Sequence, residues 1–307
     1  MRLKFGRPDL DRYADHFDVP PADADGLSVT FLGVASLLFD DGGSALMTDG
    51  FFSRPSLPTV LLRRLSPDHA RIDACLERAG VDDVEAVIPV HTHYDHALDS
   101  AVVAERTGAV LLGGTSAANV GRGHGLPEEQ VVAVESGSTT TCGNYEVTMI
   151  ASEHCPPDRY PGTIDEPLAP PARVTTYRCG EAWAIVLRHR PTEQRALVLG
   201  SAGYVEGALD GQQADVVYLG VGQLGLHSEE YIRTYWEETV GTVGARRVVL
   251  IHWDDFFRPL DQPLRALPYF GDDLDHSWRV LSKLAQRDGI DLHFPTLWQR
   301  ENPWAGL

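Results

Sequence analysis

Short apolar runs alternating with segments of helical periodicity set the pattern of this chain. Strands are expected at 27–32, 36–39 and 45–48, with a hairpin turn at Asp41-Gly-Gly, and in the run that ends at residue 90. Further strands are expected at 109–112, 131–134, 145–150, 182–187, 196–199, 216–219 and 248–251. Helices are expected from Ser66-Pro67 to Gly80, and at about 97–108, 116–121, 228–241 and 275–288. This order predicts an α/β fold: an αββα sandwich of two mixed β-sheets flanked by helices.

The composition does not divide the chain into separate units. Its 307 residues suffice for one large α/β domain, and neither a repeat nor a compositional break marks a linker, so we expect a single domain over 1–307. Residues 1–27 form a polar lead-in with room for a short helix. The proline-rich stretch 155–173 is too broken for regular structure, and such long loops serve as substrate walls, lids or mobile surface segments.

Charge and composition exclude several classes of partner. The formal net charge of −18 repels a phosphate backbone, and the pairs Arg63-Arg64 and Arg246-Arg247 are too isolated to form a basic track, so no nucleic acid is expected. No apolar run approaches the roughly 20 residues of a membrane span. Four scattered cysteines and a polar N-terminus fit a cytoplasmic protein.

The segment His91-Thr-His93-Tyr-Asp95-His96 concentrates the candidate chemistry. Four of its six side chains are good ligands for a divalent metal, and an apolar run leads directly into it. In extended chain, residues two apart point the same way, so His91 and His93 can hold one ion. Asp95 and His96 follow where the chain turns into a helix, and we expect them to face a second ion.

Three more polar residues follow apolar runs, where α/β proteins tend to place their chemistry. His154 comes four residues after Ile150, and His252 directly follows the run 248–251, where an imidazole is costly to bury unless it is paired or metal-bound. Asp49 follows the run 45–48 and precedes Gly50, so a simple turn role is an alternative for it.

With these positions in place, the chain resembles the metallo-β-lactamase superfamily from about residue 27 to His252. The HxHxDH signature is present as residues 91–96, the later lone histidine as His154, and the terminal histidine as His252. The flanking residues Tyr94 and Asp99, with Trp253 after the last histidine, are most similar to the branch of ascorbate-phosphate lactonases and N-acylphosphatidylethanolamine phospholipase D.

The resemblance implies one metal held by His91, His93 and His154. It implies a second held by Asp95, His96 and His252, with a water or hydroxide between the two ions. Asp95 would also hold or accept the proton of the attacking water, and Asp49 would accept a hydrogen bond from a ligand histidine. Imidazole and carboxylate ligands suit zinc, at one or two ions per chain, and also iron, manganese or nickel.

One position departs from the superfamily's pattern. In Gly200-Ser201-Ala-Gly203-Tyr204 the frame of the usual turn is intact, but Ser201 stands where the bridging aspartate is expected. A hydroxyl is a weaker ligand than a carboxylate and brings no negative charge. Three outcomes follow: a single firmly held ion at the three histidines, two ions joined only by hydroxide or substrate, or a pseudoenzyme.

The sequence therefore leaves three classes of function open. The leading class is a metal-dependent hydrolase that uses metal-bound hydroxide on a small ester, lactone, amide or phosphodiester, because most members of the superfamily hydrolyse. The alternatives are an iron-dependent oxidoreductase on the same scaffold and a non-catalytic ligand-binding protein. The small-molecule substrate itself and the oligomeric state are not encoded in any recognisable motif.

Overall fold

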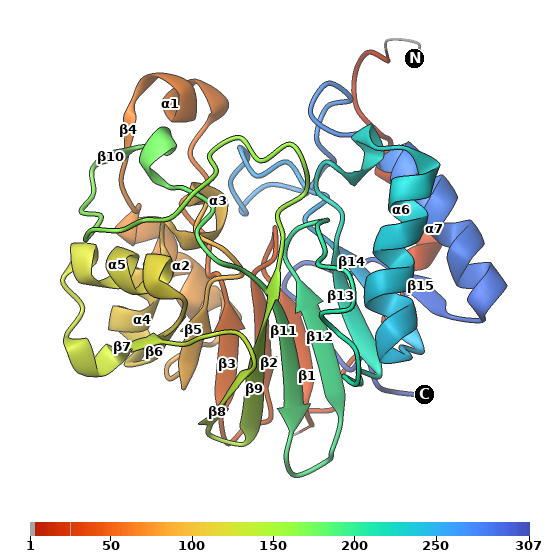
Figure 1. Cartoon of the computed structure of the whole chain (residues 1–307), viewed down its shortest axis with the longest axis horizontal. Helices are drawn as coiled ribbons and strands as arrows, with labels where there is room; N and C mark the ends of the chain where they lie inside the picture. The colour runs from red at the N-terminus through yellow and green to blue at the C-terminus, as the bar shows by residue number, and fades with distance from the viewer. Residues whose placement is uncertain (1–3, 25) are drawn as a thin grey trace.

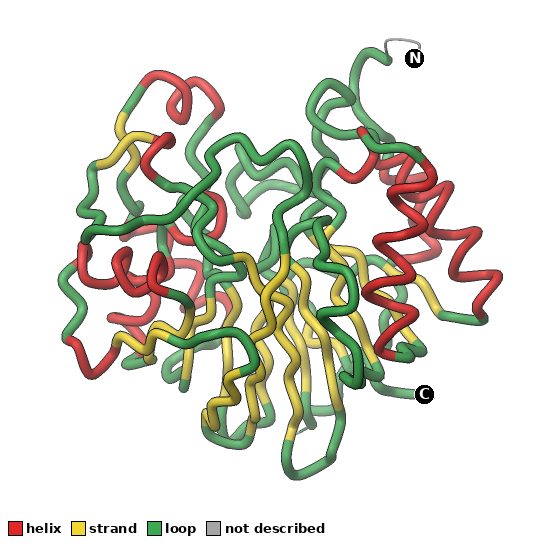
Figure 2. Tube along the Cα trace, viewed as in Figure 1, coloured by secondary structure: helices red, strands yellow, loops and turns green. Residues whose placement is uncertain are grey.

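Two β-sheets face each other at the centre of the molecule, and helices cover their outer faces (Figure 1). The computed structural model describes residues 4–24 and 26–307. In this described part of the chain each main sheet has seven strands. The tube view shows the strands crowded in the middle, the helices at the two sides and long loops along one edge (Figure 2). The αββα sandwich expected from the sequence is confirmed.

The first sheet collects the N-terminal strands and takes one strand from the C-terminal end. Its order is β16-β1-β2-β3-β5-β6-β7, in which β1 to β3 are antiparallel neighbours and β3, β5, β6 and β7 run parallel. The strands are β1 (Ser28–Phe31), β2 (Leu37–Asp40), β3 (Ala45–Thr48), β5 (Ala86–Ile88), β6 (Val110–Gly113), β7 (Val131–Ala133) and β16 (Arg300–Glu301).

The second sheet has the order β15-β14-β13-β12-β11-β9-β8. Strands β12 to β15 are parallel, whereas β8, β9, β11 and β12 alternate in direction. The strands are β8 (Ser138–Cys142), β9 (Tyr145–Ser152), β11 (Ala182–His189), β12 (Arg195–Leu199), β13 (Val216–Gly220), β14 (Arg247–Ile251) and β15 (Asp291–His293). A separate short ribbon pairs β4 (Arg64–Leu65) with β10 (Ala172–Arg173).

The helices divide between the two outer faces. On the first sheet lie α2 (His69–Ala79), α4 (Ser100–Thr107) and α5 (Thr115–His124), and on the second α6 (Glu229–Trp236) and α7 (Leu274–Asp288) (Figure 1). Short turns of helix are α1 (Leu57–Leu62), α3 (Tyr94–Ala97) and a 3-10 segment in the lead-in (Leu10–His16). None of the described helices combines the length and apolar character that crossing a membrane requires.

The two-residue period of the strands builds the sandwich. Leu37 and Phe39 of β2 point into the core between the sheets, whereas Leu38 points to the outer layer with α2 and α4. Leu46 and Met47 of β3 divide in the same way. Because these strands bury both faces, they appear in the sequence as continuous apolar runs.

Several boundaries differ from the sequence expectation. The helix expected from Ser66 begins at His69, because the Asp68 side chain accepts a hydrogen bond from the Arg71 N–H and caps the helix. The helix expected from about residue 97 begins inside the 91–96 motif, at Tyr94, and is split into α3 and α4. Asp99, at this break, accepts hydrogen bonds from Phe52 N, Ser53 N and Ser53 Oγ. The strand β8 was missed because its Ser-Thr-Thr-Thr core is polar and lies at a sheet edge.

Candidate metal centre

The predicted site residues all follow strand ends at one edge of the sandwich. Asp49 follows β3, the 91–96 motif follows β5, His154 follows β9, and His252 follows β14. Strands β3 and β5 run parallel, and so do β12, β13 and β14. The carboxyl ends of parallel strands share an edge, so residues more than 150 positions apart in the chain converge there.

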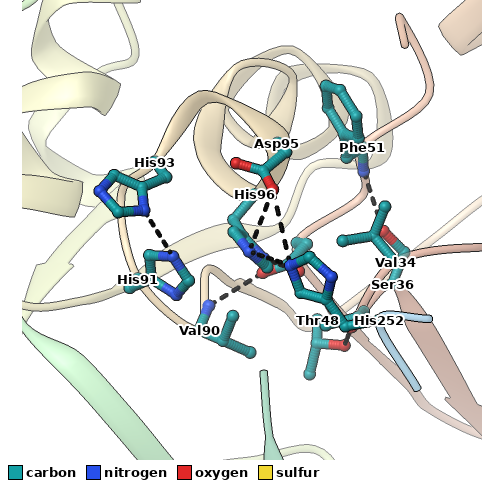
Figure 3. Close-up of polar contacts among 12 residues, drawn as sticks. Val34, Ser36, Thr48, Phe51, Val90, His91, His93, Asp95, His96 and His252 are labelled. Atoms are coloured by element: carbon teal, nitrogen blue, oxygen red, sulfur yellow. Dashed lines mark hydrogen bonds and ion pairs between the residues drawn. The ribbon is translucent and has the colours of Figure 1, made fainter. Parts of the chain in front are cut away.

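The three histidines of the first predicted triad lie together. His91 Nε2 is 3.1 Å from His93 Nδ1, and the ring of His154 lies 5.0 Å from that of His91 and 4.7 Å from that of His93. One nitrogen from each ring falls within 4.8 Å of the other two. Figure 3 shows His91 and His93 side by side with these nitrogens facing each other.

The second predicted triad is equally compact. His252 Nε2 is 3.2 Å from His96 Nε2, and Asp95 Oδ2 is 3.5 Å from the former nitrogen and 3.7 Å from the latter (Figure 3). The two triads adjoin, since the ring centroids of His91 and His96 are 4.0 Å apart. All six residues that the sequence singled out therefore form one cluster.

The spacing and the tautomers of the cluster fit a divalent ion in each triad. Ligand atoms about 2.1 Å from a tetrahedral zinc lie roughly 3.4 Å from one another, close to the 3.1 Å between His91 and His93 and to the 3.2–3.7 Å separations of the second triad. His96 Nδ1 donates to Asp49 over 2.7 Å, so His96 Nε2 presents its lone pair to the second triad. His154 Nδ1 donates to the Cys155 carbonyl over 2.7 Å, which leaves Nε2 of that ring free in the same way.

Burial and mutual charge set most of these side chains in the protonation states that ligands need. Burial first, and then the neighbouring imidazoles, lower the pKa of His91 well below its usual value and that of His154 to about 4. Burial alone would raise the pKa of Asp95, but His96 and His252 hold it well below the usual range. At His252, burial lowers the pKa and the Asp95 carboxylate raises it, with a net increase.

The backbone around His252 is held in an uncommon conformation. His252 and Val34 both have positive φ angles, 59° and 57°. The His252 N–H donates to the Val34 carbonyl over 2.7 Å, and the Val34 N–H donates to Asp254 Oδ1 over 2.9 Å. Asp254 is in turn paired with the buried guanidinium of Arg54. A left-handed backbone conformation at such residues costs about 1–3 kcal/mol each. The hydrogen bonds and the ion pair around Val34 and His252 hold the backbone in this conformation despite that cost.

Asp49 lies beside His96, as expected for a residue that accepts a hydrogen bond from a ligand histidine. It is fully buried, with one carboxylate oxygen on His96 and the other accepting from the Val90 N–H over 2.9 Å. Asp49 therefore links the start of the motif to one of its histidines. A simple turn role does not account for these two bonds.

Ser201 lies at the same edge but its hydroxyl has a backbone partner. Ser201 Oγ accepts a hydrogen bond from the Cys155 N–H over 2.9 Å. Cys155 is buried, and its sulfur lies 3.4 Å from His227 Nε2, so His227 contacts the loop that follows His154. Phe51 and Phe52 are buried in the core.

One cluster beside the first triad was not predicted from the sequence. His93, Asp158 and Cys179 bring a nitrogen, a carboxylate oxygen and a sulfur within 4.8 Å of one another. Asp158 belongs to the proline-rich stretch, for which the sequence left a substrate wall, a lid or a mobile surface segment open. The one available signal was a carboxylate four residues after His154, too weak by itself to single out.

Comparison with known proteins places the fold. No family model matches the chain. A UPF0173 metal-dependent hydrolase of Anaeromyxobacter sp. (strain K) is 28% identical over 139 residues. That match spans 44% of this chain and less than half, 45%, of the relative's own length.

Solved structures agree over much more of the chain. The metallo-β-lactamase fold protein YhfI from Bacillus subtilis matches 91% of this chain and 98% of its own, with a TM-score of 0.52 and 14% identity. This chain has the metallo-β-lactamase fold. The diiron β-hydroxylase CmlA of Streptomyces venezuelae also matches, with a TM-score of 0.53 and 14% identity over 91% of this chain and 54% of its own.

The metallo-β-lactamase fold is the one that the resemblance at residues 91–96, 154 and 252 implied. It does not choose a branch, so the likeness to ascorbate-phosphate lactonases and N-acylphosphatidylethanolamine phospholipase D stays a prediction. Proteins with this fold carry different chemistries, as a diiron hydroxylase among the matches illustrates. The fold therefore leaves the reaction open, and the side chains of the site decide it.

Proposed function

We propose that this protein is a metal-dependent hydrolase of a small ester, lactone, amide or phosphodiester. The observation that carries the proposal is the meeting of two triads, His91/His93/His154 and Asp95/His96/His252, in one buried cluster. The relative that carries the name metal-dependent hydrolase supports it. Zinc is the ion we expect, because the donors are five imidazoles and one carboxylate. The same donors also bind iron, manganese and nickel.

Bound divalent ions would supply an activated water and would polarise the scissile carbonyl or phosphoryl group. The chain's own residues prepare that chemistry. The imidazoles of His91 and His154 are kept neutral by burial, while Asp95 stays ionised and can accept a hydrogen bond from the attacking water. Asp49 keeps the His96 ring in the orientation that faces the cluster.

The first test is the metal content and hydrolysis of the purified protein. We expect one to two transition-metal ions per chain by elemental analysis. Hydrolysis of a panel of nitrophenyl esters, lactones and a nitrophenyl phosphodiester should be lost on chelation and restored by zinc. Activity that is indifferent to a chelator would refute the proposal.

Matched histidine variants sharpen this test. His91→Ala should lose metal and activity together, whereas His69→Ala, at an exposed histidine outside the cluster, should keep both. Equal metal content in the two variants would show that the cluster is not the metal site.

Iron-dependent oxidation is the second candidate, and the donor set itself allows it. The same elemental analysis separates the two. Persistent iron with a coloured protein and oxygen consumption would favour oxidation, and zinc without iron would favour hydrolysis. Binding of a ligand without turnover at full metal loading would instead indicate a non-catalytic protein.

We propose a small-molecule substrate and no nucleic-acid partner, because the net charge of −18 opposes a polyanion. The four cysteines are all free in the structure, which is consistent with the proposed cytoplasmic location.

A further inference from the structure

Asp158, in the long loop between β9 and β10, reaches back to the first triad. Its Oδ1 atom is 3.2 Å from Nε2 of His93. The other nitrogen of that ring, Nδ1, faces Nε2 of His91 at 3.1 Å. Nδ1 of the His93 imidazole therefore faces the proposed ion site, and Nε2 faces a carboxylate.

The backbone fixes Asp158 in this place. The Tyr160 N–H donates to Asp158 Oδ1 over 2.9 Å, and the Tyr160 carbonyl accepts from the Cys179 N–H over 2.8 Å. The Cys179 carbonyl accepts from the N–H of Thr92, inside the motif, over 2.8 Å. A continuous chain of hydrogen bonds thus runs from the motif through Cys179 to the loop that carries Asp158.

The arrangement repeats what Asp49 does on the other side of the cluster. Asp49 accepts from Nδ1 of His96, which leaves Nε2 of that ring facing the second triad. Asp158 stands opposite Nε2 of His93, which leaves Nδ1 facing the first triad. Each triad then has one histidine backed by a carboxylate, and such a partner fixes the tautomer and raises the basicity of the ligand.

We propose that Asp158 is a positioning residue of the metal centre: it accepts a hydrogen bond from Nε2–H of His93 and directs the Nδ1 lone pair to the ion. This inference rests on the proposed metal centre. It gives the proline-rich loop a defined role, because the segment that borders the site also orients one of its ligands.

A third cation at His93, Asp158 and Cys179 is the competing interpretation of the same cluster. It would require His93 to bind ions through both nitrogens and would require a thiolate. Burial and the adjacent Asp158 raise the pKa of the Cys179 thiol, so an ion bound there would have to displace its proton, and without an ion the thiol can donate to the carboxylate.

The test compares Asp158→Ala, Asp158→Asn and Asp165→Ala, the last at an exposed carboxylate of the same loop that bonds Thr163 and lies outside the three ligand groups. Zinc affinity is measured by competition with a chromophoric chelator, and the visible spectrum is recorded after cobalt substitution. We expect about 10–100-fold weaker binding of one ion in Asp158→Ala, with a shifted cobalt spectrum. Asp158→Asn, whose carbonyl can still accept the hydrogen bond, should recover most of both, and Asp165→Ala should match the wild type.

Thermal unfolding of the metal-free proteins controls for folding. A wild-type protein that binds metal, alongside an Asp158→Ala variant with unchanged affinity and cobalt spectrum, would overturn this inference and leave the proposed function intact. A wild-type protein that binds no metal would refute the proposed function itself. Loss of one ion equivalent in Cys179→Ser would establish the third cation site and overturn the positioning role.

Discussion

The hydroxyl oxygen of Ser201 accepts a hydrogen bond from the peptide N–H of Cys155 over 2.9 Å. This bond joins the turn after β12 to the loop that carries His154. The serine that replaces the expected bridging carboxylate thus supports the neighbouring histidine loop through its backbone. It brings no negative charge to the cluster, whose six proposed ligands include one carboxylate, that of Asp95.

Ser201→Asp is expected to tighten binding of the second ion, because a carboxylate adds charge and a stronger ligand at that turn. Calorimetric titration of the metal-free protein with zinc measures this. Ser201→Ala is the control: it leaves the Cys155 N–H without its acceptor and should lower the free energy of unfolding by about 1–3 kcal/mol. Unchanged zinc stoichiometry and affinity in Ser201→Asp would show that residue 201 does not lie between the two ions.

Asp49→Ala is expected to weaken zinc binding by about 10–100-fold, because the His96 ring loses the acceptor that orients it. The variant also leaves the Val90 N–H unpaired in a buried site, so the free energy of unfolding of the metal-free protein should fall by about 1–3 kcal/mol. Chelator competition and urea unfolding measure the two effects. A loss of stability with full zinc affinity would limit Asp49 to a structural role.

Gly222→Ala is expected to disturb the second triad selectively. A Cβ at this position would lie 2.6 Å from Nδ1 of His252, a buried ring that cannot move without leaving Asp95 and His96. Gly241→Ala is the matched control, since the nearest atom to its Cβ is the Trp236 carbonyl oxygen at 3.9 Å. Zinc titration should show one ion weakened in Gly222→Ala and none in the control. Equal binding in the two variants would contradict the placement of His252.

Glu301→Gln is expected to remove part of the pH dependence of stability. Burial raises the pKa of Glu301 to about 8, although the Thr296 N–H opposes the shift. The folded state therefore keeps a proton that the unfolded chain releases, so this contribution is complete below about pH 4.5 and declines by up to about 1.4 kcal/mol per unit until about pH 8.

The measurement for Glu301→Gln is urea unfolding of wild type and variant between pH 4.5 and 8.5. The amide that replaces the carboxyl can still accept the hydrogen bond from the Thr296 N–H. The free energy of unfolding of the variant should therefore increase relative to that of the wild type as the pH rises. Curves that stay parallel over this range would place the titration elsewhere.

The pattern of apolar residues along the chain predicted much of the architecture. The strands β1, β2 and β3 and the later β11 to β14 follow apolar runs, because strands buried on both faces leave no polar alternation. The short strands β15 and β16 gave no such signal. They acquire their pairing from β14 and β1, elements far away in sequence.

The sequence by itself determined which residues could hold metal, because six ligand-type side chains sit in a spacing that core packing or surface exposure does not demand. It did not determine what stands behind those ligands. Only the tertiary structure set Asp158 against His93 and turned the Ser201 hydroxyl to the Cys155 amide. The physical reason is that a ligand motif is a local feature of the sequence. The hydrogen-bond partner of a ligand depends on which loops lie next to each other, and that follows from the packing of the whole sandwich.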